Sequence, residues 1–303
     1  MPGETGNQTR LSYIKEVTFG TTPATPTGTI LRWTNLDLGP DRDYLENPEM
    51  RTDRQYVPGR GGVILGKGSF GGPLSYGTYD DFLASALGTD WATNVSKVGT
   101  TRLSFTMEKG HLVNGIYFPY TGVVVNGFEL SGKANQNVEA KFDLISKAAG
   151  NEAAATIWSG TTAANTNPLI TSWDGTVKKG GSTMGTVVGW SLKGDNSYED
   201  AYVCGQSSLY DLQPGRLKLT GSLELYFDSS ALYTDFRAEN EFALQLNLGP
   251  GGTKSYTIDL GRCRITKWVS NPNDENLMTQ TVEIECYAPT AGTDTAMKLT
   301  RLP

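Results

Sequence analysis

Apolar and charged side chains alternate strictly in Val138-Glu139-Ala140-Lys141-Phe142-Asp143-Leu144. Because successive side chains of a β-strand point to opposite faces, this alternation buries one face and leaves the other in water. A second stretch repeats the pattern, with Val282, Ile284 and Cys286 separated by Glu283 and Glu285. The sequence therefore predicts antiparallel β-sheet with one solvated face.

Outward from these two stretches, apolar runs and alternating runs recur between glycine-rich turns. They predict further strands at 13–19, 30–36, 63–74, 103–107, 123–130, 169–173, 187–192, 216–227, 242–248 and 255–266. Helical spacing of apolar residues occurs twice, at 78–87 and 230–239, each behind a Thr or Ser that can cap a helix. The predicted class is mainly β, with two short helices.

The chain also repeats itself in order. The segment 29–34 is echoed by 186–191, and three shorter matches follow: Pro58-Gly59-Arg60 with Pro214-Gly215-Arg216, Gly68-Ser69 with Gly221-Ser222, and Asp81-Phe82 with Asp235-Phe236. Four matches in one order indicate a duplicated domain rather than a short-period repeat. We predict an N-terminal arm at 1–28, a first copy at 29–148, a linker at 149–185 and a second copy at 186–303, each copy with one helix.

Composition narrows the class of function. The chain has 303 residues, enough for two domains, and a formal net charge of −6. An acidic chain does not wrap DNA by counterion release, although DNA could slide past it without sticking. Three cysteines without close spacing argue against a disulfide framework. No stretch reaches the ~18–20 apolar residues of a membrane helix, and no signal peptide is expected at the N-terminus.

Few residues or motifs of the sequence suggest an enzyme. His111 is the single histidine, which argues against histidine triads and histidine-rich metal sites. The stretches 61–68 and 249–255 approach a phosphate-loop pattern, but neither stands between a strand and a helix. The oxygen-rich stretch 271–276 is interpreted as a turn rather than a calcium loop. We predict no catalytic, metal or cofactor site, and therefore no enzyme.

Residues 19–88 carry a family resemblance. The stretches concerned are Phe19-Gly20-Thr21-Thr22-Pro23-Ala24-Thr25-Pro26, Leu31-Arg32-Trp33-Thr34, Glu49-Met50-Arg51-Thr52-Asp53-Arg54-Gln55, Leu74-Ser75-Tyr76-Gly77-Thr78-Tyr79-Asp80-Asp81-Phe82-Leu83 and Ala86-Leu87-Gly88. Together they resemble the tail tube proteins of long, non-contractile-tailed bacteriophages. The rest of the chain is similar in strand order only.

The resemblance implies a fold and an assembly. It implies two tandem tube domains, each a β-sandwich or half-barrel with one flanking α-helix. It further implies a virion tail protein, assembled in the bacterial host cytoplasm, that forms stacked (pseudo-)hexameric rings through which DNA is ejected. Because members with two tube domains in one chain form trimers, a homotrimer per ring is expected. The implied partners are further copies of this chain, the tail terminator, tail-tip and tape-measure proteins, and passing double-stranded DNA.

The resemblance also places candidate residues. The long polar segment 37–57 becomes the loop between rings, with Asp41, Asp43, Arg51, Asp53 and Arg54 as expected contacts. The corresponding loop at 193–213 lacks the Arg-x-Asp-Arg pattern, so the copies are expected to stack differently. Acidic side chains on the polar strand faces would line the lumen and repel phosphate: Glu139, Asp143, Glu283 and Glu285.

Two other classes remain open at this stage. A tail-tip or adhesin-like β-protein could bind carbohydrate by stacking sugars on Trp33, Trp173 or Trp190. A hydrolase would need two carboxylates in different environments across a cleft, and the sequence offers no such pair.

Overall fold

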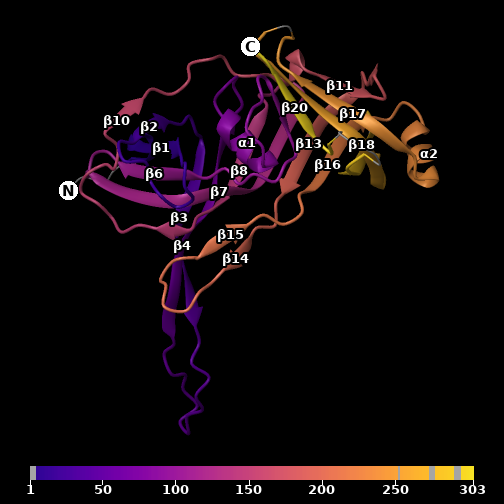
Figure 1. Cartoon of the computed structure of the whole chain (residues 1–303). Coiled ribbons are helices and arrows are strands. Elements are labelled where there is room, and N and C mark those ends of the chain that lie inside the picture. The colour runs from indigo at the N-terminus through magenta and orange to yellow at the C-terminus, as the bar shows by residue number, and fades with distance from the viewer. Residues whose placement is uncertain (1–4, 252, 273–276, 290–294) are drawn as a thin grey trace.

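The computed structural model describes residues 5–251, 253–272, 277–289 and 295–303 (Figure 1). The protein is mainly β with two short α-helices, and nearly all of its described strands belong to one large mixed sheet. Pairing within this sheet is antiparallel except between one pair of short strands, β2 and β10. The turn predicted at 271–276 and the first four residues of the expected arm fall largely outside the described residues.

We call residues 5–149 the first half. It contains η1 (Gly6–Gln8), β1 (Thr9–Lys15), β2 (Thr27–Ile30), β3 (Asn35–Leu45), β4 (Arg60–Pro73), α1 (Asp80–Leu87), β5 (Val95–Lys97), β6 (Phe105–His111), β7 (Ile116–Lys133), β8 (Glu139–Ile145) and β9 (Ala148–Ala149). The connecting segment 150–175 holds β10 (Gly160–Thr162) and η2 (Ser172–Asp174).

We call residues 176–303 the second half. It contains β11 (Thr176–Lys179), β12 (Ser182–Thr183), β13 (Val187–Asp195), β14 (Glu199–Ala201), β15 (Asp211–Gln213), β16 (Lys218–Tyr226), α2 (Ala231–Ala238), β17 (Glu241–Leu248), β18 (Ser255–Asn271), β19 (Thr279–Cys286) and β20 (Lys298–Leu302).

Strands pair in a regular order in each half. In the first half the order is β1–β6–β7–β8–β4–β3. In the second half it is β11–β17–β18–β19–β16–β13. The two series meet where β13 pairs antiparallel with β7, with Asp195 opposite Gly127 and Gly189 opposite Lys133. We call this contact the internal seam, and it makes one continuous sheet from the two series.

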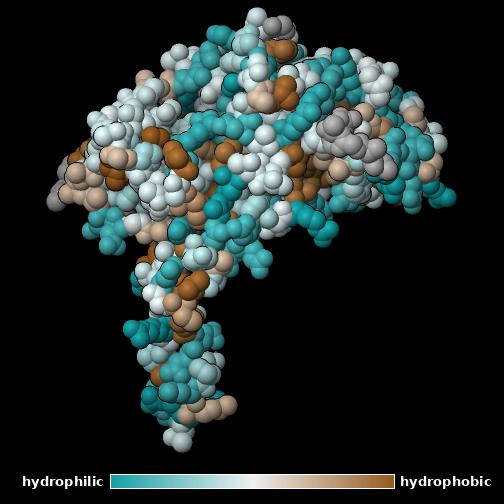
Figure 2. All heavy atoms as spheres, in the orientation of Figure 1, coloured by the Kyte–Doolittle hydropathy of each residue, from teal (hydrophilic) through white to brown (hydrophobic). Residues whose placement is uncertain are grey.

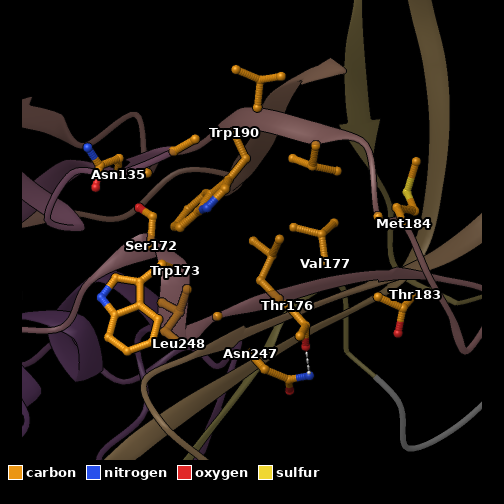
Figure 3. Close-up of a pocket in the computed structure, with 17 residues that line it drawn as sticks. Asn135, Ser172, Trp173, Thr176, Val177, Thr183, Met184, Trp190, Asn247 and Leu248 are labelled. Atoms are coloured by element: carbon orange, nitrogen blue, oxygen red, sulfur yellow. Dashed lines mark hydrogen bonds between the residues drawn. The ribbon is translucent and has the colours of Figure 1, made fainter. Parts of the chain in front are cut away.

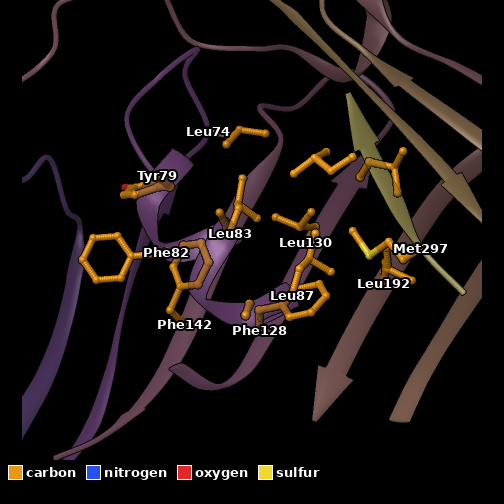
Figure 4. Packing of buried hydrophobic residues seen from close by; sticks show 14 of the residues in the cluster. Leu74, Tyr79, Phe82, Leu83, Leu87, Phe128, Leu130, Phe142, Leu192 and Met297 are labelled. Carbon is orange, nitrogen blue, oxygen red and sulfur yellow. The ribbon is translucent and has the colours of Figure 1, made fainter. Parts of the chain in front are cut away.

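The core is continuous across the internal seam. In the first half, aromatic rings pack together beside α1, with Phe82 in contact with Phe70, Phe105 and Phe142. Leu192 and Met297 of the second half, both buried, extend this cluster toward Leu87 and Leu130 (Figure 4). Such aromatic and aliphatic packing is the main source of stability in a β-rich core.

Polar contacts reinforce the same junction. Asp80, at the start of α1, accepts hydrogen bonds from the Tyr256 hydroxyl and, at 2.6 Å, from the Arg301 guanidinium. The Asn196 side chain donates to the main-chain oxygens of Ala86 and Val125, at 3.0 Å in each case. The second half therefore covers α1 with both apolar and polar groups.

The predicted loop at 37–57 is wrong for its first part. β3 continues to Leu45 and pairs with β4 over most of its length, with Asp41 opposite Leu65 and Leu45 opposite Arg60. Only the tip 46–59 lacks strand structure, and the hairpin projects away from the rest of the molecule (Figure 1). The segment lacks apolar alternation because this part of the hairpin is largely exposed, and Pro40 is tolerated because β3 is an edge strand.

The predicted strand at 169–173 is also wrong. Ile170 is buried and its main chain bonds to Leu74 and Val138, but these contacts are two isolated bridges, at Leu169 and Thr171, that are followed by η2. The strand that pairs with β17 is β11 instead. The strand predicted at 30–36 is likewise divided between β2 and β3, because residues 31–34 leave the sheet.

Candidate functional site

The four acidic residues expected to line a lumen share one face of the large sheet. Glu139 and Asp143 lie on β8, and Glu283 and Glu285 lie on β19. Each alternates with buried neighbours such as Phe142 and Ile284, so their side chains point to the solvated face. We call this face the polar face. It runs without interruption from β3 through the internal seam to β18.

Lysines are interleaved with these acids on the polar face. Asp143 lies 3.3 Å from Lys141, Glu283 lies 2.7 Å from Lys267, and Glu285 lies 3.8 Å from Lys218. A fourth pair, Glu129 and Lys193, spans the internal seam at 3.2 Å. The polar face therefore carries mixed charge, with acids and lysines in neighbouring positions.

Glu139 differs from the other three acids. Among the described residues no lysine or arginine forms an ion pair with it, and burial raises the pKa of its carboxyl. The lysines beside the other acids were already visible in the sequence as Lys141, Lys218 and Lys267, but strand pairing had to bring Lys218 and Lys267 beside their acids.

The five residues expected at ring contacts fall into two groups. Arg51, Asp53 and Arg54 lie in the tip of the β3–β4 hairpin, where the Arg51 guanidinium binds the Asp53 carboxylate at 2.6 Å. This ion pair lowers the pKa of Asp53 and raises the pKa of Arg51. Met50 and Tyr56 beside them are 100% and 98% exposed. Figure 2 shows such apolar side chains among hydrophilic ones along the projecting hairpin.

Asp41 and Asp43 lie closer to the sheet, on β3. Asp41 is 3.7 Å from Lys67 of β4, and Asp43 accepts a hydrogen bond of 3.2 Å from the Tyr202 hydroxyl. Burial, followed by the nearby Asp200 and Asp43 carboxylates, raises the pKa of Tyr202 to about 12. These contacts hold the base of the hairpin against the segment that carries β14 and β15.

The tryptophans considered for sugar binding do not share one environment. Trp173 and Trp190 line a pocket of about 370 Å³ between β13, β11 and β17 (Figure 3). Trp33 and Trp190 are partly buried against the core, whereas Trp173 is 76% exposed. None of the residues that line this pocket carries an ionisable side chain. The pocket therefore holds no general acid or base.

Neither a metal-binding group nor a membrane-spanning helix is found among the described residues. They contain no group of three or more His, Cys, Asp or Glu side chains that could hold a metal ion. His111 ends β6, and its ring packs edge-on against Phe118. None of the described helices is long and apolar enough to cross a membrane.

What remains as a functional surface is a broad polar face, a projecting hairpin and an open sheet edge, all of them features of a protein that assembles. The family described as phage tail tube protein matches residues 6–296 of the chain. The chain belongs to this family. No curated protein matches it. The resemblance drawn from residues 19–88 is thereby confirmed, and the family match extends through the second half as well.

Membership of the phage tail tube family fixes the broad function. The protein is a structural component of the virion tail and not an enzyme. Its family implies assembly with further copies and with other tail proteins.

Proposed function

We propose that this tail tube protein forms rings of three chains, which stack into the hollow tube that conducts DNA. The observation that carries the proposal is the internal seam, where β13 adds to β7 and makes one sheet from two strand series with the same pairing order. A chain built in this way supplies two units of a ring. Three chains then supply six, and joining their sheets edge to edge would pair the open edge strands of neighbouring chains.

Detailed correspondences support two tandem tube domains, at 29–148 and 186–303. A bulge interrupts the pairing of β7 with β8 between Val125 and Gly127, and another interrupts β18 with β19 between Ile265 and Lys267. Of the segments that precede the domains, 1–28 would add β1 to the first domain, and 149–185 would add β11, with its short partner β12, to the second.

A second correspondence lies at the other end of the same strands. The Leu74 amide donates to the Val138 oxygen at 2.7 Å, and the Phe227 amide donates to the Met278 oxygen at 2.9 Å. Both bonds follow the last residue of a strand, β4 or β16, and reach the residue just before its partner, β8 or β19. Bulges and end contacts at equivalent places are expected of two copies of one domain.

The polar face is the proposed lumen wall. Glu139, Asp143, Glu283 and Glu285 would face passing DNA there and repel its phosphates, and the interleaved lysines would weaken that repulsion. Such a wall neither holds phosphate by counterion release nor excludes it strongly, which suits passage without sticking. The proposal is contradicted if a ring places this face outward.

The β3–β4 hairpin is the proposed contact between rings. It projects from the sheet, and its tip combines exposed apolar side chains with the Arg51–Asp53 ion pair. Exposed apolar groups rimmed by charge are typical of a protein contact surface. The ends of the tube would be closed by tail terminator and tail-tip proteins, with a tape-measure protein inside.

Electron microscopy of the concentrated, incubated protein tests the proposal. Hollow tubes with three chains and pseudo-sixfold symmetry in each ring are expected. Six chains in a ring would contradict the trimer, and closed oligomers without a channel would contradict the tube.

A shortened hairpin separates stacking from ring formation. Replacement of residues 46–59 by Asn-Gly should leave rings that no longer stack, because a two-residue turn closes the same hairpin without its tip. The matched control shortens the exposed segment 203–207 between β14 and β15, which keeps Tyr202 and the buried Leu209 and should leave the tubes intact. Tubes of normal length in the first variant would rule out the tip as the contact between rings.

A further inference from the structure

The two halves differ in what covers them. Leu74 and Val138 are 1% and 0% exposed, whereas Phe227 and Met278, which make the matching main-chain bond, are 39% and 37% exposed. The main chain of Ile170 forms hydrogen bonds to Leu74 and Val138. Nearby, β13 pairs with β7 in the internal seam. At the second-half position the described residues provide no such cover.

More apolar side chains are exposed around the same place. Tyr226 ends β16, Tyr233 lies on α2, Val269 is near the end of β18, and Leu277 precedes β19. Strand pairing brings these ends together, because Thr279 lies opposite both Tyr226 and Asn271. Tyr226 and Val269 point to the polar face, in line with Glu224 and Lys267. We call the other four, Phe227, Tyr233, Leu277 and Met278, the α2 patch.

Two strand edges are also open. In the part of the chain that the structure describes, β3 pairs only with β4, and residues 267–271 of β18 pair only with β19. These edges correspond to the two strands of the internal seam. β3 ends the first series as β13 ends the second, and β18 occupies the place of β7.

The internal seam fixes the register in which these edges would meet. Trp268 is opposite Val282 after the bulge, just as Phe128 is opposite Phe142, so Trp268 corresponds to Phe128. Leu38 is opposite Gly68 of β4, as Leu192 is opposite Gly221 of β16 in the repeated Gly-Ser pair. In the seam, Gly194 lies opposite Phe128 and Leu192 lies opposite Leu130.

We infer that the edge of β18 and the α2 patch bind β3 and the adjoining domain of a second copy of this chain, in the register of the internal seam. That register places Asp41 of one subunit opposite Lys267 of the next and Gly39 opposite Val269. The inference rests on the proposed ring and names its subunit contact.

Charge supports this register. Within the internal seam, Lys193 pairs with Glu129 at 3.2 Å across the two strands. Between subunits, the seam register sets an acid opposite a lysine once more, at Asp41 and Lys267. Both side chains lie on the polar face and both are exposed. Lys267 already bonds Glu283 at 2.7 Å, so the contact would place one ammonium between two carboxylates.

Disulfide cross-linking tests the register in the full-length protein. The variant carries D41C and K267C in a C204S background, because Cys204 is the exposed native thiol. Directly opposite residues of antiparallel strands are within reach of a disulfide. The control pairs D37C with K267C, four residues out of register on the same face, and should yield less than about a tenth of the cross-linked oligomer.

The outcomes separate this inference from the proposed function. Rings or tubes that cross-link through 41 and 267 support both. Rings or tubes that form but cross-link through 37 and 267, or through neither pair, overturn the inferred contact and leave the tube intact. Cross-linking through 41 and 267 without tubes supports the contact and counts against the tube. A protein that neither assembles nor cross-links overturns both.

A charge swap gives a second measurement that does not depend on disulfide geometry. D41K and K267E should each reduce the assembled fraction about two- to fivefold by setting like charges opposite one another, as measured by sedimentation velocity. The double variant D41K/K267E should recover assembly in part, because it restores opposite charges between subunits while it sets like charges beside Lys67 and Glu283 within each subunit. Additive loss in the double variant would overturn the pairing.

Discussion

The two α-helices of this tail tube protein have equal length and occupy equivalent places between strands, yet they lie in different environments. In α1 every residue except Asp81 is buried, whereas in α2 only Leu232 is buried. Each helix packs on the long strand of its half, β7 or β18. The difference comes from what lies against the helix. Segment 89–104 of the first half and, through Asn196, Tyr256 and Arg301, the second half both contact α1, whereas the described residues give α2 no comparable cover.

A subunit contact can be recognised where one of two equivalent surfaces lacks the cover that the other has. The internal seam shows how the sheet and its helix are closed when a neighbouring domain is present. The second half shows the same surface without its neighbour. Four predictions test the comparison, in order of decreasing effect on the stability of the isolated subunit.

The largest difference should come from the matched phenylalanines of the repeat. Phe82→Ala removes a fully buried ring that contacts four other aromatic residues, and should lower the free energy of unfolding by about 3–5 kcal/mol. Phe236→Ala, in the half-exposed α2, should cost about 1 kcal/mol. Urea unfolding of the unassembled subunit measures both. Equal losses would show that α1 and α2 are covered alike.

Asn196→Ala tests the internal seam itself. The change leaves the buried main-chain oxygens of Ala86 and Val125 without their donor, and should cost about 1–3 kcal/mol. Ser197→Ala, at the next and more exposed position, serves as the control and should change stability by less than about 0.5 kcal/mol. The same unfolding assay applies. A neutral Asn196→Ala variant would mean that the seam is held by strand pairing and apolar contacts alone.

Acid should weaken a contact between the halves at Asp211. Burial acts to raise the pKa of this carboxyl, but hydrogen bonds from Arg102, Gln213 and the Leu212 amide outweigh it and hold the pKa below its usual value. A lowered folded-state pKa adds stability that is present above the unfolded value of about 3.9 and is lost as pH falls through the folded-state pKa.

The expected size of this effect is about 1 kcal/mol or less, because the pair is partly exposed. Thermal unfolding between pH 6 and about pH 3 should show a smaller acid loss in Asp211→Asn than in the unchanged protein. If the two proteins lost stability equally in acid, the Arg102–Asp211 contact would not stabilise the junction between the halves.

The smallest effect on the subunit should come from the hairpin tip. Arg51→Ala breaks an exposed ion pair and should leave the free energy of unfolding unchanged within the error of the assay. Tube length in electron micrographs should nevertheless fall if the tip joins rings. If Arg51→Ala destabilised the subunit and left tube length unchanged, the tip would support the fold of the subunit and not the contact between rings.

Sequence reasoning predicted the mainly β class, the two helices and the polar face, because these depend on local periodicity. β8 and β19 follow the alternation of Phe142 and Ile284 with charged neighbours almost residue for residue. The strand half of the 37–57 segment was missed because an exposed edge strand has no buried face to impose a pattern. A strand was wrongly predicted at 169–173 because Ile170 is buried by contacts with residues far away in sequence and not by strand pairing of its own segment.

The amino-acid sequence alone indicates which side chains face water, since strand and helix geometry assign faces from one residue to the next. Which charges meet and which helix is covered depend on contacts between distant parts of the chain. Lys267 reaches Glu283 only because β18 pairs with β19, and Asp80 is buried only because Tyr256 and Arg301, both from the second half, lie against it. Such contacts join residues remote in sequence, and their energy depends on a register that no local pattern contains.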